Sequence, residues 1–187
     1  MPMGRRLNPD DEIRALLVGK TPFCELETRW ADGKLPLRLH YYVSDEQPPE
    51  KLVTSVRCLV LKDGSVLVLR NREGYHVLPG GRCEEGESLE QSLHREVAEE
   101  TGWTIEAVSR LGFIHLEHLG PKPTGYRFPH PHFFQIVYTA RASEYMPASV
   151  IDVDYEESAA FVPMGELDSL GISDAELGYL RFFMEGT

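Results

Sequence analysis

Cysteine, positive charge and long hydrophobic runs are all scarce in this 187-residue sequence. Its cysteines, Cys24, Cys58 and Cys83, are odd in number and contain no CxxC pair, which argues against a disulfide framework and indicates reduced thiols. No apolar run approaches the length that spans a membrane, and no apolar segment follows the charged N-terminus as it would in a signal peptide. We therefore expect a soluble, cytoplasmic protein without a membrane partner.

Basic residues are outnumbered: 19 lysines and arginines face 30 aspartates and glutamates, so the formal net charge is −11. A surface of this sign argues against unaided binding to nucleic acid or to anionic membranes. Small phosphorylated substrates remain compatible with it, because a bound divalent ion reverses the local field. The length fits one domain of ordinary size with an additional segment.

Many of the acidic residues gather between Gly81 and Trp103, and the second half of this stretch has the periodicity of an amphipathic helix. Ser88 followed by Gln91 is the sequence signal of a capping box at the helix start. An apolar stripe then recurs at helical spacing, formed by Leu89, Leu93 and Val97.

Three glutamates of this helix, Glu96, Glu99 and Glu100, fall on or beside the apolar stripe instead of opposite it. Carboxylates directed at the protein body are costly to desolvate without a partner. Mg²⁺ and Mn²⁺ are natural partners, because hard cations prefer oxygen ligands. The alternative interpretation is an acidic helix whose charges are simply solvated.

The residues just before the helix also suggest a site. Leu78-Pro79-Gly80-Gly81 combines a stiff proline with two glycines, which permit a close approach of the backbone. A backbone carbonyl of this loop, that of Gly81, can join the carboxylates as a metal ligand. Arg95 can pair with Glu87 and so fix the loop to the helix.

This pattern resembles the complete signature of the Nudix hydrolase family: Gly81, five residues, Glu87, seven residues, then Arg95-Glu96-Val97-Ala98-Glu99-Glu100-Thr101-Gly102-Trp103. A looser resemblance extends over roughly residues 50 to 170. It implies an α/β fold, the Nudix α/β/α sandwich with a mixed β-sheet. It also implies metal-dependent hydrolysis of a nucleoside diphosphate linked to another moiety, with Mg²⁺ or Mn²⁺ as cofactor. The catalytic and metal-binding residues would be Arg95, Glu96, Glu99 and Glu100, with Gly81 as a further metal ligand.

The first 50 residues are expected to form an N-terminal extension of the Nudix domain, which would comprise residues 51–187. A helix should begin at Asn8-Pro9, and two alternating strands at 23–30 and 35–43 should form a β-hairpin across an Asp32-Gly33 turn. Pro36 would suit an edge strand. Because such a hairpin exposes an edge and an apolar face, we expect a homodimer through roughly residues 20 to 45.

The remaining elements follow from the same patterns. Lys62-Asp63-Gly64 is a hairpin signal between two apolar, β-branched runs. A C-terminal helix should start at Ser173 and place Leu177, Leu180 and Met184 along one side. The expected strands lie at 53–61, 66–69, 75–78, 105–119 (as one or two strands), 133–142 and 159–162.

Several residues outside the signature are candidates for the site. Family members often use a loop carboxylate as an extra metal ligand or general base, and Glu156 is the candidate here. Its alternative is a solvated pair with Glu157. Substrate contacts are assigned to Arg57, Arg70, Glu87 and Tyr126: arginine suits bidentate phosphate binding, and Tyr126 could stack on a nucleobase. The alternatives are surface ion pairs for the arginines and a core or rim position for the tyrosine.

A group of four histidines, His115, His118, His130 and His132, makes a zinc site conceivable. Their spacing matches no standard ligand pattern, so exposed or hydrogen-bonded histidines are the alternative.

Two other functions compete with hydrolysis of a small nucleotide. A non-catalytic Nudix domain that senses or regulates by binding a nucleotide would typically lose signature carboxylates, and this chain keeps them all. Processing of capped RNA would favour a basic groove that the composition does not indicate. The chain length and the N-terminal strands are similar to those of ADP-ribose-type pyrophosphatases, and Pro121 lies near, but not clearly at, a proline typical of that subgroup. The sequence does not specify the substrate.

Overall fold

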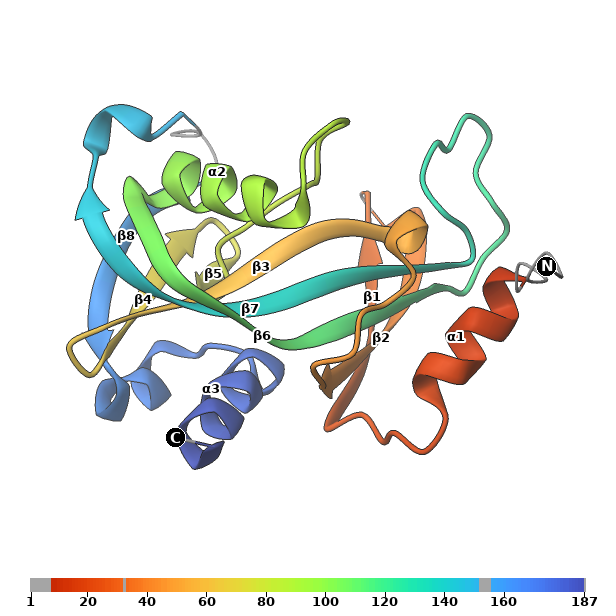
Figure 1. The fold of residues 1–187 in the computed structure, drawn as a ribbon, viewed down its shortest axis with the longest axis horizontal. Coiled ribbons are helices and arrows are strands. Elements are labelled where there is room, and N and C mark those ends of the chain that lie inside the picture. The colour runs from red at the N-terminus through yellow and green to blue at the C-terminus, as the bar shows by residue number, and fades with distance from the viewer. Residues whose placement is uncertain (1–7, 32, 152–155, 187) are drawn as a thin grey trace, which may run out of the picture.

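A mixed eight-stranded sheet forms the centre of the computed structural model, which describes residues 8–31, 33–151 and 156–186 (Figure 1). The strand order is β1-β2-β6-β7-β3-β4-β5, and β8 pairs with β4. Strands β3 and β7 are parallel, and the other pairs are antiparallel. The strands are β1 (Cys24–Trp30), β2 (Leu35–Val43), β3 (Val53–Lys62), β4 (Ser65–Asn71), β5 (Gly74–His76), β6 (Trp103–His118), β7 (His132–Tyr145) and β8 (Glu156–Pro163).

Helices cover both faces of this sheet, with α2 (Leu89–Thr101) and α3 (Asp174–Gly186) on opposite sides (Figure 1). Leu93 and Val97 of α2 are fully buried in one apolar cluster, and Tyr179 of α3 is fully buried in the other. The Tyr179 hydroxyl donates to the Phe113 carbonyl oxygen at 2.9 Å, which satisfies its buried polar group. The expected α/β/α arrangement is confirmed. The helices are α1 (Pro9–Leu17), α2 (Leu89–Thr101) and α3 (Asp174–Gly186), and short 3-10 helices span Glu50–Leu52, Pro147–Ser149 and Met164–Leu170.

The N-terminal hairpin is confirmed and is continuous with the main sheet. Its second strand, β2, pairs with β6 from Leu37↔His118 to Val43↔Gly112. The expected edge position of Pro36 is wrong, because β2 lies between β1 and β6 and β1 is the edge strand. Pro36 is tolerated there because it precedes the first residue paired with β6. Asp32 of the expected turn lies outside the described residues.

Most other expected elements are present with shifted ends. Of the one or two strands expected at 105–119, the structure has a single long strand, β6, which ends at His118. The expected Lys62-Asp63-Gly64 hairpin joins β3 to β4, and Asp63 and Gly64 both have positive φ. Met184 does not share the buried side of α3: it is 51% exposed whereas Leu180 is 4% exposed, because the last turn extends past the buried core.

No helix within the described residues is both long enough and apolar enough to cross a membrane.

Candidate active site

Helix α2 positions the signature glutamates, and its ends are set by local hydrogen bonds. The Ser88 side chain accepts the Gln91 N–H at 3.1 Å, and the Gln91 side chain accepts the Ser88 N–H at 2.8 Å. The expected capping box is therefore confirmed. At the other end Gly102 adopts φ 74°, the left-handed conformation that suits a helix C-terminus.

The glycine loop before α2 pairs with β3 along the part of its edge that β4 leaves open. The Cys58 N–H donates to the Pro79 carbonyl oxygen, and the Val56 N–H donates to the Gly81 carbonyl oxygen, both at 2.9 Å. Gly80 has φ +137°, and a Cβ there would lie 2.3 Å from the Val56 carbonyl oxygen. Only glycine fits this close approach. The loop is therefore held in one position against the sheet.

Gly81 is packed from the helix side. A Cβ on this residue would lie 2.3 Å from Oε2 of Glu96 and 2.7 Å from its Oε1. The Glu96 carboxylate thus occupies the space that any side chain at Gly81 would take. Glu100 also reaches this loop, since its Oε2 accepts the Gly80 N–H at 2.7 Å.

Arg95 joins the loop to three carboxylates. Its Nε and Nη2 donate to the two oxygens of Glu87 at 2.8 and 2.9 Å, which confirms the expected pair. Its Nη1 donates to Glu96 at 2.8 Å and to Glu99 at 3.2 Å. Hydrogen bonds from Arg95, and then from Ser92, lower the pKa of Glu87 to about 2. The sequence assigned Glu87 to the substrate, but in the structure its carboxylate accepts hydrogen bonds from Arg95 and Ser92.

The donor chemistry of this cluster fits a hard divalent cation. The Arg95 guanidinium contacts three carboxylates, those of Glu87, Glu96 and Glu99, so negative charge is in excess. The side-chain atoms that these glutamates offer to a metal ion are all oxygens. Among the described residues, however, no three His, Cys, Asp or Glu side chains converge around a common point. The metal-ligand roles of Gly81, Glu96, Glu99 and Glu100 stay a prediction. Glu156 begins β8 opposite Asn71, and its side chain lies outside those that the structure describes.

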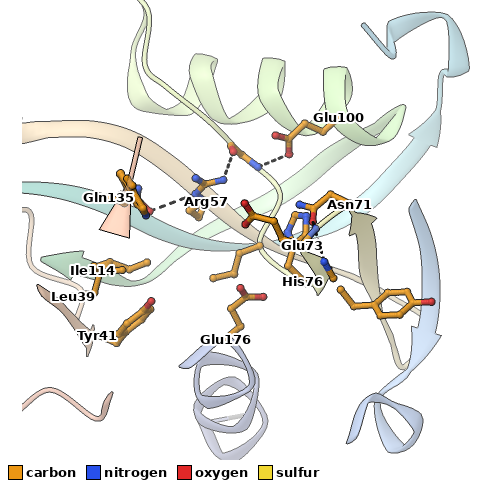
Figure 2. A pocket seen from close by; sticks show the side chains of 15 residues that line it. Leu39, Tyr41, Arg57, Asn71, Glu73, His76, Glu100, Ile114, Gln135 and Glu176 are labelled. Carbon is orange, nitrogen blue, oxygen red and sulfur yellow. Dashed lines mark hydrogen bonds between the residues drawn. The ribbon is translucent and has the colours of Figure 1, made fainter. Parts of the chain in front are cut away.

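A cavity of about 540 Å³ opens beside the loop and reaches from α2 to α3 (Figure 2). Glu100 enters it from α2, and Glu176 enters from α3 on the opposite side. Strands β2 and β6 contribute apolar side chains to its wall, including Leu39 and Ile114. The cavity is therefore built from the signature helix, the N-terminal hairpin and the C-terminal helix together.

Arg57 is the predicted substrate arginine that lines this cavity. Its guanidinium donates to the Gly80 carbonyl oxygen and, at 3.5 Å, to the Gln135 side chain. Arg70 is not among the lining residues. Arg70 is exposed, lies 3.5 Å from Glu157, and stacks over the ring of Tyr75. It therefore forms a surface ion pair, the alternative to a substrate contact that the sequence left open.

Tyr126 is likewise not among the residues that line the cavity. It is half-buried, and its hydroxyl lies 3.0 Å from Nε2 of His118. The neighbouring Phe128 packs under the guanidinium of Arg82, next to the glycine loop. A stacking role for Tyr126 would require a substrate that extends beyond the cavity.

The histidines form two separate stacks on the sheet. His115 is 5% exposed, its Nε2 lies 3.1 Å from Nδ1 of His132, and its ring stacks on His40. His118 stacks on His130 in the second group. Burial, followed by the charges of His132 and His40, lowers the pKa of His115 to about 3. No zinc geometry occurs among the described histidines, which are packed and hydrogen-bonded.

Sequence reasoning missed several residues that line the cavity: Tyr41, Glu73, Gln135 and Glu176. Tyr41 and Gln135 belong to alternating strand patterns that also describe ordinary core positions. Glu176 had only one sequence signal, its spacing from the helix-capping Ser173. Nothing local distinguishes a cavity position from a core or cap position, because these residues converge from β2, the β4–β5 turn, β7 and α3.

The sequence model of the NUDIX domain family matches residues 51–181. The chain is 35% identical over 74 residues to the oxidized purine nucleoside triphosphate hydrolase of Danio rerio, covering 37% of this chain and 46% of that protein. It is 48% identical over 46 residues to an uncharacterized Nudix hydrolase, YvcI, of Bacillus subtilis, covering 24% of this chain and 29% of that protein. The chain thus spans less than half the length of these curated relatives.

The fold is similar to that of a Bacillus subtilis pyrophosphohydrolase, BsRppH, solved as a mutant. The TM-score is 0.58 at 18% identity, and the alignment covers 86% of this chain and 97% of that one. At this identity the likeness concerns the fold alone. The family match covers most of the chain and contains the loop, helix and carboxylates described above. The chain therefore belongs to the Nudix hydrolase family.

Proposed function

We propose that this protein is a metal-dependent pyrophosphohydrolase that cleaves a nucleoside diphosphate linked to another moiety. Water would attack one phosphorus of the diphosphate, and the other phosphate would leave. The observation that carries the proposal is the position of Glu100, which belongs to the carboxylate-rich side of α2 and also lines the 540 Å³ cavity. The name of the similar nucleoside triphosphate hydrolase supports the same reaction class.

The carboxylates of Glu96, Glu99 and Glu100, the Gly81 carbonyl oxygen and Glu156 would hold Mg²⁺ or Mn²⁺. When bound, such an ion neutralises phosphate oxygens and acidifies the attacking water. Arg95 holds Glu87, Glu96 and Glu99 in place, which keeps the carboxylates oriented. Phosphoryl transfer depends mainly on positioning and charge stabilisation, so these groups are sufficient machinery.

Arg57 is the residue we assign to the substrate phosphates. It lines the cavity close to Glu100, and its guanidinium is oriented by Gly80 and Gln135. A guanidinium that is already oriented loses little freedom when it binds a phosphate. Arg70 and Tyr126 lie outside the cavity lining and would contact only a substrate that extends past it.

The decisive experiment is a hydrolysis screen with Mg²⁺ or Mn²⁺ over ADP-ribose, nucleotide sugars, dinucleoside polyphosphates, NADH and nucleoside triphosphates. We expect activity on at least one of them, complete loss in EDTA and recovery with added metal. Products formed in isotopically labelled water identify the phosphorus that is attacked. Full activity in a chelator, or no hydrolysis of any diphosphate despite tight nucleotide binding, would contradict the proposal; the second result would favour a nucleotide sensor.

We also propose a homodimer formed through the N-terminal hairpin. Strand β1 is an edge of the sheet, and unpaired edges favour association unless they are covered. Light scattering at tens of micromolar protein tests this, and a monomer with a folded hairpin would count against it.

The division into an extension (residues 1–50) and a Nudix domain (51–187) stays a prediction. Because β2 pairs with β6, removal of residues 1–50 would uncover β6, and we expect the truncated chain to be less stable. A cytoplasmic location also stays a prediction.

A further inference from the structure

Glu176 is a carboxylate that the family signature does not include, yet it enters the same cavity as Glu100. It lies in the first turn of α3 and points toward the cavity from the side opposite α2 (Figure 2). Its Oε2 accepts the Val77 N–H at 2.8 Å, which fixes the orientation of the carboxylate. No salt bridge to Glu176 occurs within the described ranges of the chain. The positive charges of His76 and Arg57 act on Glu176 and oppose the rise in its pKa that burial causes. The carboxylate thus faces the space that the substrate would fill.

The hydrogen-bonding capacity of this carboxylate is only partly used. An ionised carboxylate accepts about four hydrogen bonds. Val77 and Ser173 supply donors from the protein, and burial nevertheless raises the pKa of Glu176. The remaining capacity is directed at the cavity. It suits a ligand group that presents two neighbouring N–H donors.

The surroundings of Glu176 suit a flat ring. Leu39 and Ile114 supply apolar side chains to the cavity wall on the side of Tyr41 (Figure 2). Tyr41, the cross-strand partner of Ile114, lines the cavity with them and is only 7% exposed. Burial, and then the charge of Glu176, raises the pKa of Tyr41, so its hydroxyl remains protonated and can donate a hydrogen bond. This side of the cavity therefore combines apolar walls with an acceptor pair and one donor.

The negative charge of the cavity lining disfavours a phosphate group beside Glu176. Three carboxylates line the cavity, Glu73, Glu100 and Glu176, against one arginine, Arg57, and one histidine, His76. A metal ion would compensate carboxylates at the Glu100 end but not Glu176. The group beside Glu176 should therefore be uncharged and rich in donors. Of the common bases, guanine presents two adjacent N–H donors, N1–H and the N2 amino group, next to the acceptor O6.

We propose that Glu176 is a specificity-determining residue that selects guanine as the base of the substrate. Its carboxylate accepts N1–H and the N2 amino group, and the Tyr41 hydroxyl donates to O6. Adenine is disfavoured because its N1 is an acceptor and would face the carboxylate. The assignment rests on the proposed function, since it names the base of the nucleotide that the enzyme would cleave.

The test measures binding of mononucleotides in EDTA, where hydrolysis plays no part. Ligand-detected NMR and calorimetry on the full chain compare GMP, IMP, AMP and deoxy-GMP at up to millimolar concentrations. We expect GMP to bind most tightly, IMP more weakly because it lacks the amino group, and AMP weakest, with about tenfold to hundredfold between GMP and AMP. Deoxy-GMP should match GMP. Equal affinity for GMP and AMP, no GMP binding, or a large loss for deoxy-GMP would each overturn the proposal.

Glu176→Gln tests the residue itself. Glutamine keeps an oxygen that can accept the Val77 N–H, so the fold should be preserved, and circular dichroism checks this. We expect GMP affinity to fall by about tenfold to hundredfold and AMP affinity to stay within a few-fold. Glu185→Gln, an exposed residue of the same helix, is the matched control and should bind GMP like the wild type.

An unchanged preference for GMP in Glu176→Gln would overturn the assignment. Failure of this inference and failure of the proposed function are separable. Hydrolysis of the substrate panel without base preference rejects only the role of Glu176. Selective GMP binding without hydrolysis of any panel substrate rejects only the proposed hydrolase activity.

Discussion

The backbone of Gly81 lies against the carboxylate of Glu96, so closely that a Cβ on Gly81 would stand 2.3 Å from Oε2 and 2.5 Å from Cδ of that glutamate. The first glycine and the first helix glutamate of the signature are therefore coupled through space. The same carboxylate accepts a hydrogen bond from Arg95 at 2.8 Å, so its position is set from two sides. Any side chain at Gly81 must displace it.

Gly81→Ala should therefore damage activity more than stability. The backbone of Gly81 does not have positive φ, so alanine is conformationally allowed, but Glu96 must move away from Arg95. We expect metal affinity and hydrolysis to fall by about tenfold to hundredfold. Steady-state kinetics with a metal titration measures both. Gly165→Ala is the matched control, since nothing lies within 4 Å of a Cβ there and φ is not positive. Wild-type kinetics in Gly81→Ala would contradict the coupling.

Substitutions of Glu100 should separate its role in catalysis from its role in holding the glycine loop. Glu100→Gln keeps an oxygen for the Gly80 N–H, so thermal stability without metal should remain near that of the wild type. Turnover should fall by orders of magnitude, and stabilisation by Mg²⁺ should shrink, because it depends on metal affinity for the folded state. Glu100→Ala also loses the hydrogen bond and should unfold about 1–2 kcal/mol more easily. If Glu100→Gln destabilises the apo protein and leaves hydrolysis intact, the glutamate is structural.

His115 should make the fold sensitive to mild acid. Its pKa is lowered from the usual 6.5 to about 3, so the folded protein keeps it neutral while the unfolded chain takes up a proton below pH 6.5. The free energy of unfolding should consequently decrease as pH falls from 6.5 toward 3, by about 1.4 kcal/mol per pH unit, or about 2 kcal/mol at pH 5. Urea denaturation at pH 7 and pH 5 measures this.

His115→Gln retains a partner for His132 and should remove most of that difference between pH 7 and pH 5. His94→Gln, an exposed histidine of α2, is the control and should keep it. An identical acid dependence in His115→Gln would show that other groups cause it.

The Arg95–Glu87 pair predicts a second, more acidic transition. Glu87 has a folded pKa of about 2 against 4.5 in the unfolded chain, chiefly because Arg95 donates two hydrogen bonds to it. Its stabilising contribution is therefore present above pH 4.5 and is lost as pH falls toward 2. Arg95→Gln should lower the melting temperature at pH 7 and flatten its decline between pH 4.5 and pH 2. Calorimetric melting curves across this range test it, and an unaltered decline would count against the pair.

The signature helix and its anchoring could be predicted from the sequence, because the interactions involved are local. Ser88 and Gln91 cap the helix within one turn, and the spacing of Leu93 and Val97 decides which side is buried. The Arg95–Glu87 pair was also predictable, since loop and helix are adjacent in the chain. For the same reason the Asp63-Gly64 turn and its hairpin could be predicted from the local sequence.

Which side chains share the cavity could not be predicted from the sequence, because it depends on contacts between distant segments. Arg57 and Arg70 look equivalent in sequence, but Arg57 lines the cavity whereas Arg70 pairs with Glu157 on the surface. Tyr41 and Glu176 line the same cavity because β2 pairs with β6 and α3 packs against this sheet, and these segments are far apart in the chain. Periodicity assigns a residue to a face of its own strand or helix. What lies across that face depends on how the elements pack against one another, and no local pattern encodes it.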